Sequence, residues 1–172
     1  MATRIINFSV DRPDGTSVLN NRILDALNAW NLPRDLDQGI ILHPVRLPRD
    51  FDNSRPANMR FWYNGFGTIS GGSIVFRMRW NVARPVPPTT SVIFDWVSTP
   101  PNPLFQSQVV DELIDDGSGV TFPPHSFNQD DTLGVTVYRQ GTDPADTVLQ
   151  LCRVCANMVL EYTPLCARCC CP

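Results

Sequence analysis

The stretch from Asp130 to Tyr162 decides the fold, and its first part, residues 130–140, reads DDTLGVTVYRQ. The apolar residues of this part recur at every second position, and a period of two predicts a strand with one buried face. Residues 141–146, GTDPAD, are rich in turn formers. A second run, RVCANMVLEY at 153–162, alternates again. The stretch therefore predicts two adjacent strands in an antiparallel hairpin that closes a β-sandwich.

The same alternation recurs over the rest of the chain. It is clearest at residues 73–82, SIVFRMRWNV, where Ile, Phe, Met and Trp alternate with Val, Arg and Asn. Weaker segments of the same kind lie at 5–10, 40–48, 60–64, 92–96, 106–113 and 119–122. Short β segments separated by turns predict an all-β chain, and its 16 prolines disfavour long helices. The predicted fold is an antiparallel jelly-roll-like β-sandwich with an N-terminal arm or short helix and a Cys-rich C-terminal tail.

Three regions are predicted along the chain. Residues 1–46 form an N-terminal segment, residues 47–164 the sandwich, and residues 165–172 the Cys-rich tail. Within the first region, the apolar residues from Val18 to Trp30 recur at roughly helical spacing before Pro33, so residues 17–32 are the best helical candidate.

The period of two also predicts which side chains face the core. Five aromatic side chains are expected there: Trp62, Phe76, Trp80, Phe94 and Trp96. Arg77 and Arg79 share the opposite face of the clearest strand, where they meet solvent or the carboxylates of a neighbouring subunit. They are the candidate interface residues.

Composition argues against several classes of function. The net charge of −3 does not favour nucleic acid, whose binders carry basic patches. No apolar run is long enough for a membrane-spanning helix, and the N-terminus lacks the apolar core of a signal peptide. The two histidines, His43 and His125, lie beside proline in apparent loops, without a nucleophile-elbow motif. The sequence thus predicts a protein that is not an enzyme and needs no cofactor.

The cysteines leave three alternatives open. Cys152 and Cys155 are spaced as Cys-x-x-Cys, and Cys166, Cys169, Cys170 and Cys171 follow near the chain end. The spacing of Cys152, Cys155, Cys166 and Cys169 matches a four-thiolate zinc site. However, a zinc knuckle needs a tight turn, whereas the first pair lies on a predicted strand, so no metal site is expected. Disulfide bonds among the four tail cysteines, partly between subunits, are the main prediction, and free thiols are the third alternative.

Three pieces of the chain carry a resemblance to a known family. Residues 47–52, LPRDFD, precede the aromatic strand at 61–63; residues 73–80 form an amphipathic strand; and residues 130–147 lead through an Asp-rich turn towards Glu161 and Tyr162. In this order they resemble jelly-roll structural proteins of tailed-bacteriophage virions, namely capsid decoration (cement) proteins, head spikes and related fibre domains. The resemblance spans roughly residues 47–162 and leaves the N-terminal segment and the Cys-rich tail unmatched.

The resemblance implies a function and partners. A capsid decoration protein binds the major capsid protein on the outer surface of the virion, bridges and stabilises capsomers, and is synthesised in the host cytoplasm. A homotrimer is expected, with no nucleic-acid or membrane partner. The alternative implied by the same family is a tail-fibre or receptor-binding module that recognises host surface glycans.

Overall fold

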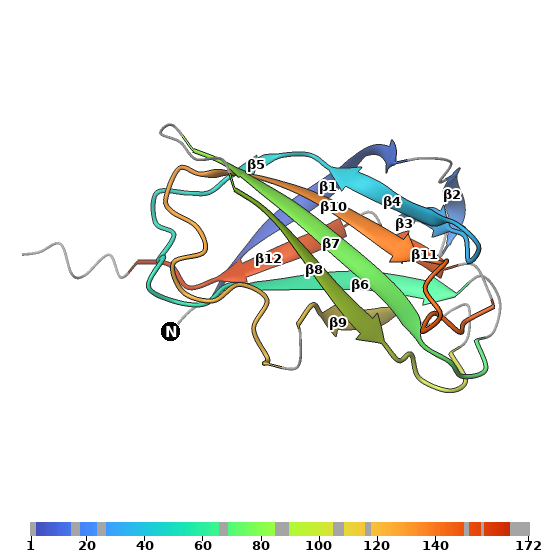
Figure 1. The fold of residues 1–172 in the computed structure, drawn as a ribbon. Coiled ribbons are helices and arrows are strands. Elements are labelled where there is room, and N and C mark those ends of the chain that lie inside the picture. The colour runs from blue at the N-terminus through green and yellow to red at the C-terminus, as the bar shows by residue number, and fades with distance from the viewer. Residues whose placement is uncertain are drawn as a thin grey trace, which may run out of the picture.

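The computed structural model describes residues 3–14, 18–23, 27–65, 69–84, 90–104, 109–115, 118–149, 152–155 and 157–165. Within these residues every regular element is a strand, and Figure 1 shows them as one curled, two-layered all-β domain. The strands are β1 (Arg4–Asp14), β2 (Val18–Ile23), β3 (Leu27–Leu32), β4 (Asp37–Leu42), β5 (Val45–Arg46), β6 (Asn58–Gly65), β7 (Ile74–Ala83), β8 (Thr90–Ser98), β9 (Val110–Leu113), β10 (Thr132–Gln140), β11 (Cys152–Cys155) and β12 (Asn157–Tyr162). The fold is a jelly-roll-like antiparallel β-sandwich, as predicted.

Strand β1 joins the two sheets. Its first half pairs with β12 in sheet A, and from Val10 onward it pairs with β4 in sheet B, with a register shift between Val10 and Arg12. Sheet B continues from β4 through β10 and β7 to β8. In sheet A, one edge of β6 pairs with β9, and its other edge pairs with β11 and β12, one after the other along the strand. Strand β3 pairs with the far edge of β11, and β2 pairs with β3. A bulge of this kind bends a strand, which lets β1 turn the corner of the sandwich.

The helix predicted at residues 17–32 is wrong. The described residues there form β2 and β3, which pair antiparallel, and β3 pairs in turn with β11. The apolar residues at roughly helical spacing lie on two six-residue strands. Asn is frequent in both, and Asn has a poor helix propensity because its side chain competes for backbone hydrogen bonds. The described strands of the N-terminal segment are thus built into both sheets and do not form a separate arm.

The hairpin predicted from residues 130 to 162 is also wrong. Both of its strands form, but β10 pairs with β4, β5 and β7 in sheet B, whereas β12 pairs with β1 and β6 in sheet A. The chain after β10 therefore crosses from one sheet to the other. Each strand carries the expected alternation, yet alternation shows only that a strand has a buried face and does not reveal its partner.

The core lies between the two sheets and is rich in aromatic rings. On β7, Ile74, Phe76, Met78, Trp80 and Val82 are buried, as the alternation predicted. The Phe76 ring contacts Phe61 of β6 edge to face at 4.7 Å between centroids, so this contact joins sheet B to sheet A. Edge-to-face contacts of this kind add about 0.5–1.5 kcal/mol to the burial of the rings.

The five aromatic residues expected in the core have different positions. Phe76, Trp80 and Trp96 are buried. Phe94 is only partly buried and packs against the edge of the core, because β8 is the last strand of sheet B. Trp62 is half-buried and alternates with the buried Phe61 and Tyr63, so it points to the outer face of sheet A.

Candidate ligand-binding groove

The outer face of sheet B carries a row of side chains that runs across four strands. Tyr138 of β10 is directly opposite Gly39 of β4 on one side and Arg77 of β7 on the other. Arg77 is in turn opposite Asp95 of β8. Residues directly opposite each other in antiparallel strands have their Cβ atoms about 4.5–5.5 Å apart, so the four residues form one continuous cross-strand row. This set, Gly39, Tyr138, Arg77 and Asp95, is called the cross-strand row below.

The glycine in this row makes room for the tyrosine ring. A Cβ atom placed on Gly39 would lie 2.7 Å from Cδ1 and 3.0 Å from Cγ of Tyr138, as well as 2.4 Å from the carbonyl oxygen of Val137. The Tyr138 ring therefore packs directly over the backbone of Gly39. This contact holds a half-buried aromatic ring on a solvent-facing side of the sheet.

A two-pronged ion pair forms the other half of the row. Arg77 donates from Nε to Oδ1 of Asp95 at 2.6 Å and from Nη2 to Oδ2 at 2.7 Å. This hydrogen bond raises the pKa of Arg77, and the negative charges of Asp95, Asp37 and Asp143 raise it further. Both side chains are partly exposed. A planar fork of this geometry presents a fixed set of donors and acceptors.

A groove of about 590 Å³ lies beside Asp95, at the β8 end of the cross-strand row. It is lined by Val75, Asp95, Trp96, Val97, Asp115, Asp143 and Ala145. The volume falls within the range of about 300–1,000 Å³ that is typical of small-molecule sites. Asp95 belongs to both features, so the groove continues directly from the cross-strand row.

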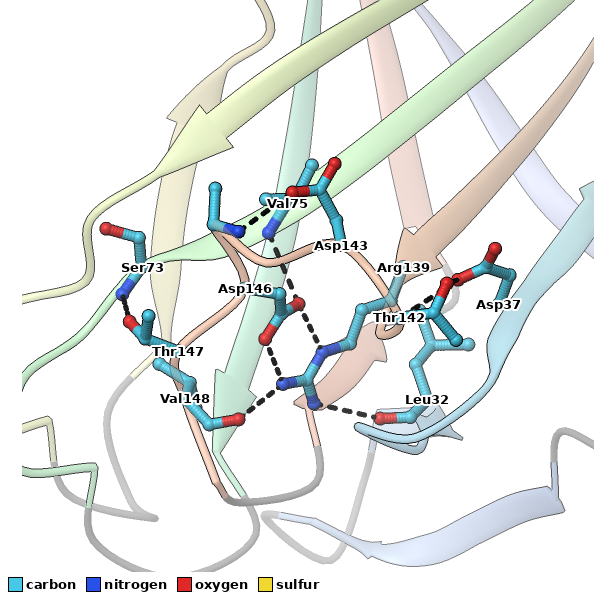
Figure 2. Close-up of polar contacts among 11 residues, drawn as sticks. Leu32, Asp37, Ser73, Val75, Arg139, Thr142, Asp143, Asp146, Thr147 and Val148 are labelled. Atoms are coloured by element: carbon cyan, nitrogen blue, oxygen red, sulfur yellow. Dashed lines mark hydrogen bonds and ion pairs between the residues drawn. The ribbon is translucent and has the colours of Figure 1, made fainter.

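One wall of the groove is the turn after β10, which carries Asp143 and Ala145 and is held by a buried ion pair. Figure 2 shows Arg139 of β10 between the carboxylate of Asp146 and the carbonyl oxygens of Leu32 and Val148. Arg139 donates to the two Asp146 oxygens at 2.8 and 2.7 Å, and both side chains are fully buried. Asp146 also accepts the backbone N–H of Val75 at 3.3 Å. The turn that carries Asp143 and Ala145 into the groove is thereby tied to β7 and β10.

A second contact fixes the same turn to β4. The side-chain oxygen of Asp37 accepts hydrogen bonds from the hydroxyl of Thr142 at 2.8 Å and from its backbone N–H at 3.2 Å (Figure 2). Gly141, beside Thr142, packs closely against the segment that precedes β4, since a Cβ there would lie 1.9 Å from the carbonyl oxygen of Arg34. The groove wall is therefore held at both ends, which keeps its carboxylates in place without a ligand.

A half-buried glutamate lies behind the groove. Glu112 of β9 pairs with Phe61 and so points to the inner side of sheet A, towards Trp96 and Ser98 of β8. Burial raises the pKa of Glu112, and the charge of Asp115 adds to this, whereas the nearby polar groups of Ser98 and Trp96 lower it in part. Trp96 also lines the groove. Glu112 thus lies where the edges of the two sheets meet.

This burial predicts how stability depends on pH. Because the folded pKa of Glu112 lies above its unfolded value of about 4.5, the folded state binds the proton more tightly. The stabilising contribution is fully present below that value and is lost as the pH rises through the folded pKa. We expect wild type to lose stability relative to Glu112→Gln as the pH rises through this window. Urea titrations at several pH values measure the two free energies of unfolding. A difference that stays constant across this window would contradict the assignment.

The other candidate residues from the sequence lie elsewhere. Arg79 is exposed on the same outer face as Arg77, one row along, opposite Ile93. His43 is exposed, with its Nδ1 atom 3.8 Å from Asp11, and His125 lies in an exposed turn with φ 67°. Neither histidine lines the groove.

The cysteine predictions fall partly outside the described residues. Cys152 and Cys155 are the first and last residues of β11. This strand pairs with β3 and β6, so the prediction of a strand at these two cysteines is confirmed. Cys166, Cys169, Cys170 and Cys171 lie outside the described residues, so the disulfide prediction stays a prediction. In the part of the chain that the structure describes, no group of three or more His, Cys, Asp or Glu side chains could hold a metal ion. Nor does any helix there have the length and apolar character to cross a membrane.

The sequence pattern does not predict the groove. It places Tyr138 within the strand at residues 130–140 and Asp143 within the turn at residues 141–146, and assigns neither a binding role. One signal was present: Arg139 is in phase with Leu133, Val135 and Val137, so the alternation places a charged side chain on the core side. A buried guanidinium requires a carboxylate nearby, and the Asp-rich turn that follows supplies it.

Comparisons with known proteins identify no family. No family model matches the sequence, and no curated protein matches it. Six chains of solved structures are similar, among them two at low identity. TmCBM61 in complex with β-1,4-galactotriose shares 11% identity over 94% of this chain and 88% of that chain, with a TM-score of 0.38. A family 11 carbohydrate-binding module from Clostridium thermocellum, in complex with a β-1,3-1,4-mixed-linked tetrasaccharide, shares 12% identity over 91% and 87%, with a TM-score of 0.42.

TM-scores below 0.5 are too low to support an argument about this chain. Its fold and its groove therefore rest on its own strand pairing and side chains. The resemblance to phage structural proteins, the trimer and the capsid partner stay predictions, because none of these comparisons tests them.

Proposed function

We propose that the protein is a non-enzymatic carbohydrate-binding module whose site is the cross-strand row and the adjoining groove on the outer face of sheet B. The observation that carries the proposal is the Tyr138 ring held over Gly39, in one row with the Arg77–Asp95 fork. Jelly rolls are used for both lectins and viral capsid proteins, so the fold itself leaves the choice open.

The chemistry of this row suits a sugar ring. A pyranose has a face of C–H groups and a rim of hydroxyls that both donate and accept hydrogen bonds. The negatively polarised face of an aromatic ring attracts C–H groups, and Tyr138 supplies such a ring. Arg77 supplies N–H donors and Asp95 supplies acceptors beside it. An apolar surface with a few fixed polar groups is the general pattern of a small-molecule site.

Substitutions in the row test this directly. In calorimetric titrations with a panel of neutral oligosaccharides, Tyr138→Ala should weaken binding by about tenfold or more, as expected when an aromatic anchor is removed. Tyr138→Phe keeps the ring and should bind within a few-fold of wild type. Arg77→Ala should also weaken binding, because its donors are lost.

A matched control comes from the opposite sheet. Arg60 of β6 forms an ion pair with Asp111 at 2.9 Å on the outer face of sheet A. Arg60→Ala should leave binding unchanged. Wild-type affinity in both Tyr138→Ala and Arg77→Ala, or the absence of binding to any glycan in the panel, would overturn the proposal.

The place of the module on a virion is the finer part of the proposal. The family resemblance is compatible with capsid decoration and with a receptor-binding module, and a glycan-binding groove favours the second role. We expect immunogold labelling of particles to mark the tail and not the head. Label over the head, at the sites of the capsid lattice, would favour decoration.

A further inference from the structure

The charges around the groove limit which glycans it can accept. This inference rests on the proposed carbohydrate site and concerns the class of ligand. Three carboxylates, Asp95, Asp115 and Asp143, line the groove. A fourth, Asp37, is held next to the same turn by its hydrogen bonds to Thr142. The charges of Asp37 and Asp143 both act on the Arg77 guanidinium.

The cation of the cross-strand row, Arg77, already forms an ion pair. Arg77 gives its Nε and Nη2 donors to Asp95 at 2.6 and 2.7 Å, so the charge of the guanidinium is offset by that carboxylate. Arg139 lies behind the wall of the groove, but it is fully buried and paired with Asp146. Arg79 lies in the next row, opposite the apolar Ile93. An acidic ligand would therefore meet an excess of negative charge where it enters the groove.

The position of these carboxylates does not depend on a ligand. Asp143 accepts the backbone N–H of Ala145 at 2.8 Å, which fixes its side chain in the turn. Asp37 is fixed by Thr142, and Asp95 by Arg77. Fixed like charges oppose an anion more strongly than mobile ones, which can move away. Repulsion built into a site is a common source of specificity.

We infer that the groove selects neutral glycans and rejects acidic ones, such as uronate-bearing, sialylated or sulfated chains, through the carboxylates of Asp37, Asp95, Asp115 and Asp143. The hydroxyls of a neutral sugar donate to the oxygens of the three carboxylates that line the groove, whereas Asp37 acts only through its charge. A carboxylate or sulfate in the same place has no proton to donate and adds repulsion.

The test compares matched ligands. A neutral oligosaccharide that binds wild type is oxidised at C6 of its hexose units, which replaces hydroxymethyl groups by carboxylates on the same backbone. Calorimetry at low salt should show at least about tenfold weaker binding of the oxidised form. The difference should shrink as salt is raised, because the Debye length falls from about 30 Å at 0.01 M to about 10 Å at 0.1 M. Wild type alone provides this measurement, so it does not depend on the folding of any variant.

A charge-neutralising variant locates the effect. In Asp37→Asn/Asp143→Asn each amide oxygen can still accept the hydrogen bonds from Thr142 and Ala145, so the turn should be retained while two negative charges are removed. The discrimination against the oxidised ligand should fall to a few-fold. Asp111→Asn, which removes one negative charge from the outer face of sheet A, should leave the discrimination unchanged.

The outcomes separate the two proposals. Equal affinity for neutral and oxidised ligands, or unchanged discrimination in the double variant, would overturn the charge selection and leave the carbohydrate site standing. Tighter binding of the oxidised ligand would do the same. Absence of binding to any oligosaccharide would overturn the site and, with it, the inference.

Discussion

Replacing Arg139 with Met is expected to lower the free energy of unfolding by about 3–5 kcal/mol, the cost of removing one partner of a buried ion pair. The substitution leaves the Asp146 carboxylate fully buried without its guanidinium. It also removes the donors to the carbonyl oxygens of Leu32 and Val148 at 3.3 and 2.6 Å. Urea denaturation followed by tryptophan fluorescence measures the change.

Two further variants sharpen this result. Arg60→Met breaks an Arg–Asp pair that is joined by a hydrogen bond of 2.9 Å on the partly exposed face of sheet A, where ion pairs contribute about 0–1 kcal/mol. A similar cost for Arg60→Met and Arg139→Met would contradict the buried role. The double variant Arg139→Met/Asp146→Leu should cost less than the sum of its two single variants, because neither charge is then left alone.

The same ion pair connects stability with the proposed site. Asp146 holds Val75 and the turn after β10, and this turn brings Asp143 and Ala145 to the groove. A variant that loosens the pair should therefore weaken ligand binding even where the protein remains folded. Arg60→Met should not have this effect.

The local sequence pattern predicted which face of a strand is buried, but it did not predict which strands pair with each other. The alternation on β7 identified its buried face, and the aromatic run at residues 61–63 identified β6. By contrast, the assumption that adjacent strands pair placed β10 and β12 in one hairpin, although they lie in different sheets. A strand with one buried face satisfies the pattern in either sheet, so the sequence holds no local signal for this choice.

The groove and the cross-strand row could not be predicted from the sequence for a related reason. Gly39, Tyr138, Arg77 and Asp95 are far apart along the chain and meet only through the registers of three strand pairs. A shift of one residue in any of these registers would turn a strand over and remove its residue from the row. The proline-flanked histidines and the cysteines are conspicuous within a short window, but His43 and His125 do not line the groove, and the tail cysteines lie outside the described residues.

Phe76→Ala is expected to lower the free energy of unfolding by about 3–5 kcal/mol, the range for truncating a large buried aromatic side chain. The ring is fully buried and contacts Phe61, Tyr63 and Trp96, with centroids 4.7, 5.3 and 5.2 Å away. These neighbours come from both sheets, so the surrounding backbone cannot collapse into the space without separating strand pairs.

Phe94→Ala is the matched control, because it removes the same atoms from the neighbouring strand. Phe94 is only partly buried at the edge of the core, and its contact with Trp96 is longer, at 6.5 Å between centroids. Water can fill the space that the smaller side chain leaves, so the cost should stay below about 2 kcal/mol, close to the burial term alone. Comparable losses for Phe76→Ala and Phe94→Ala would mean that β8 is not the outer strand of sheet B, and the cross-strand row that ends at Asp95 would then have to be redrawn.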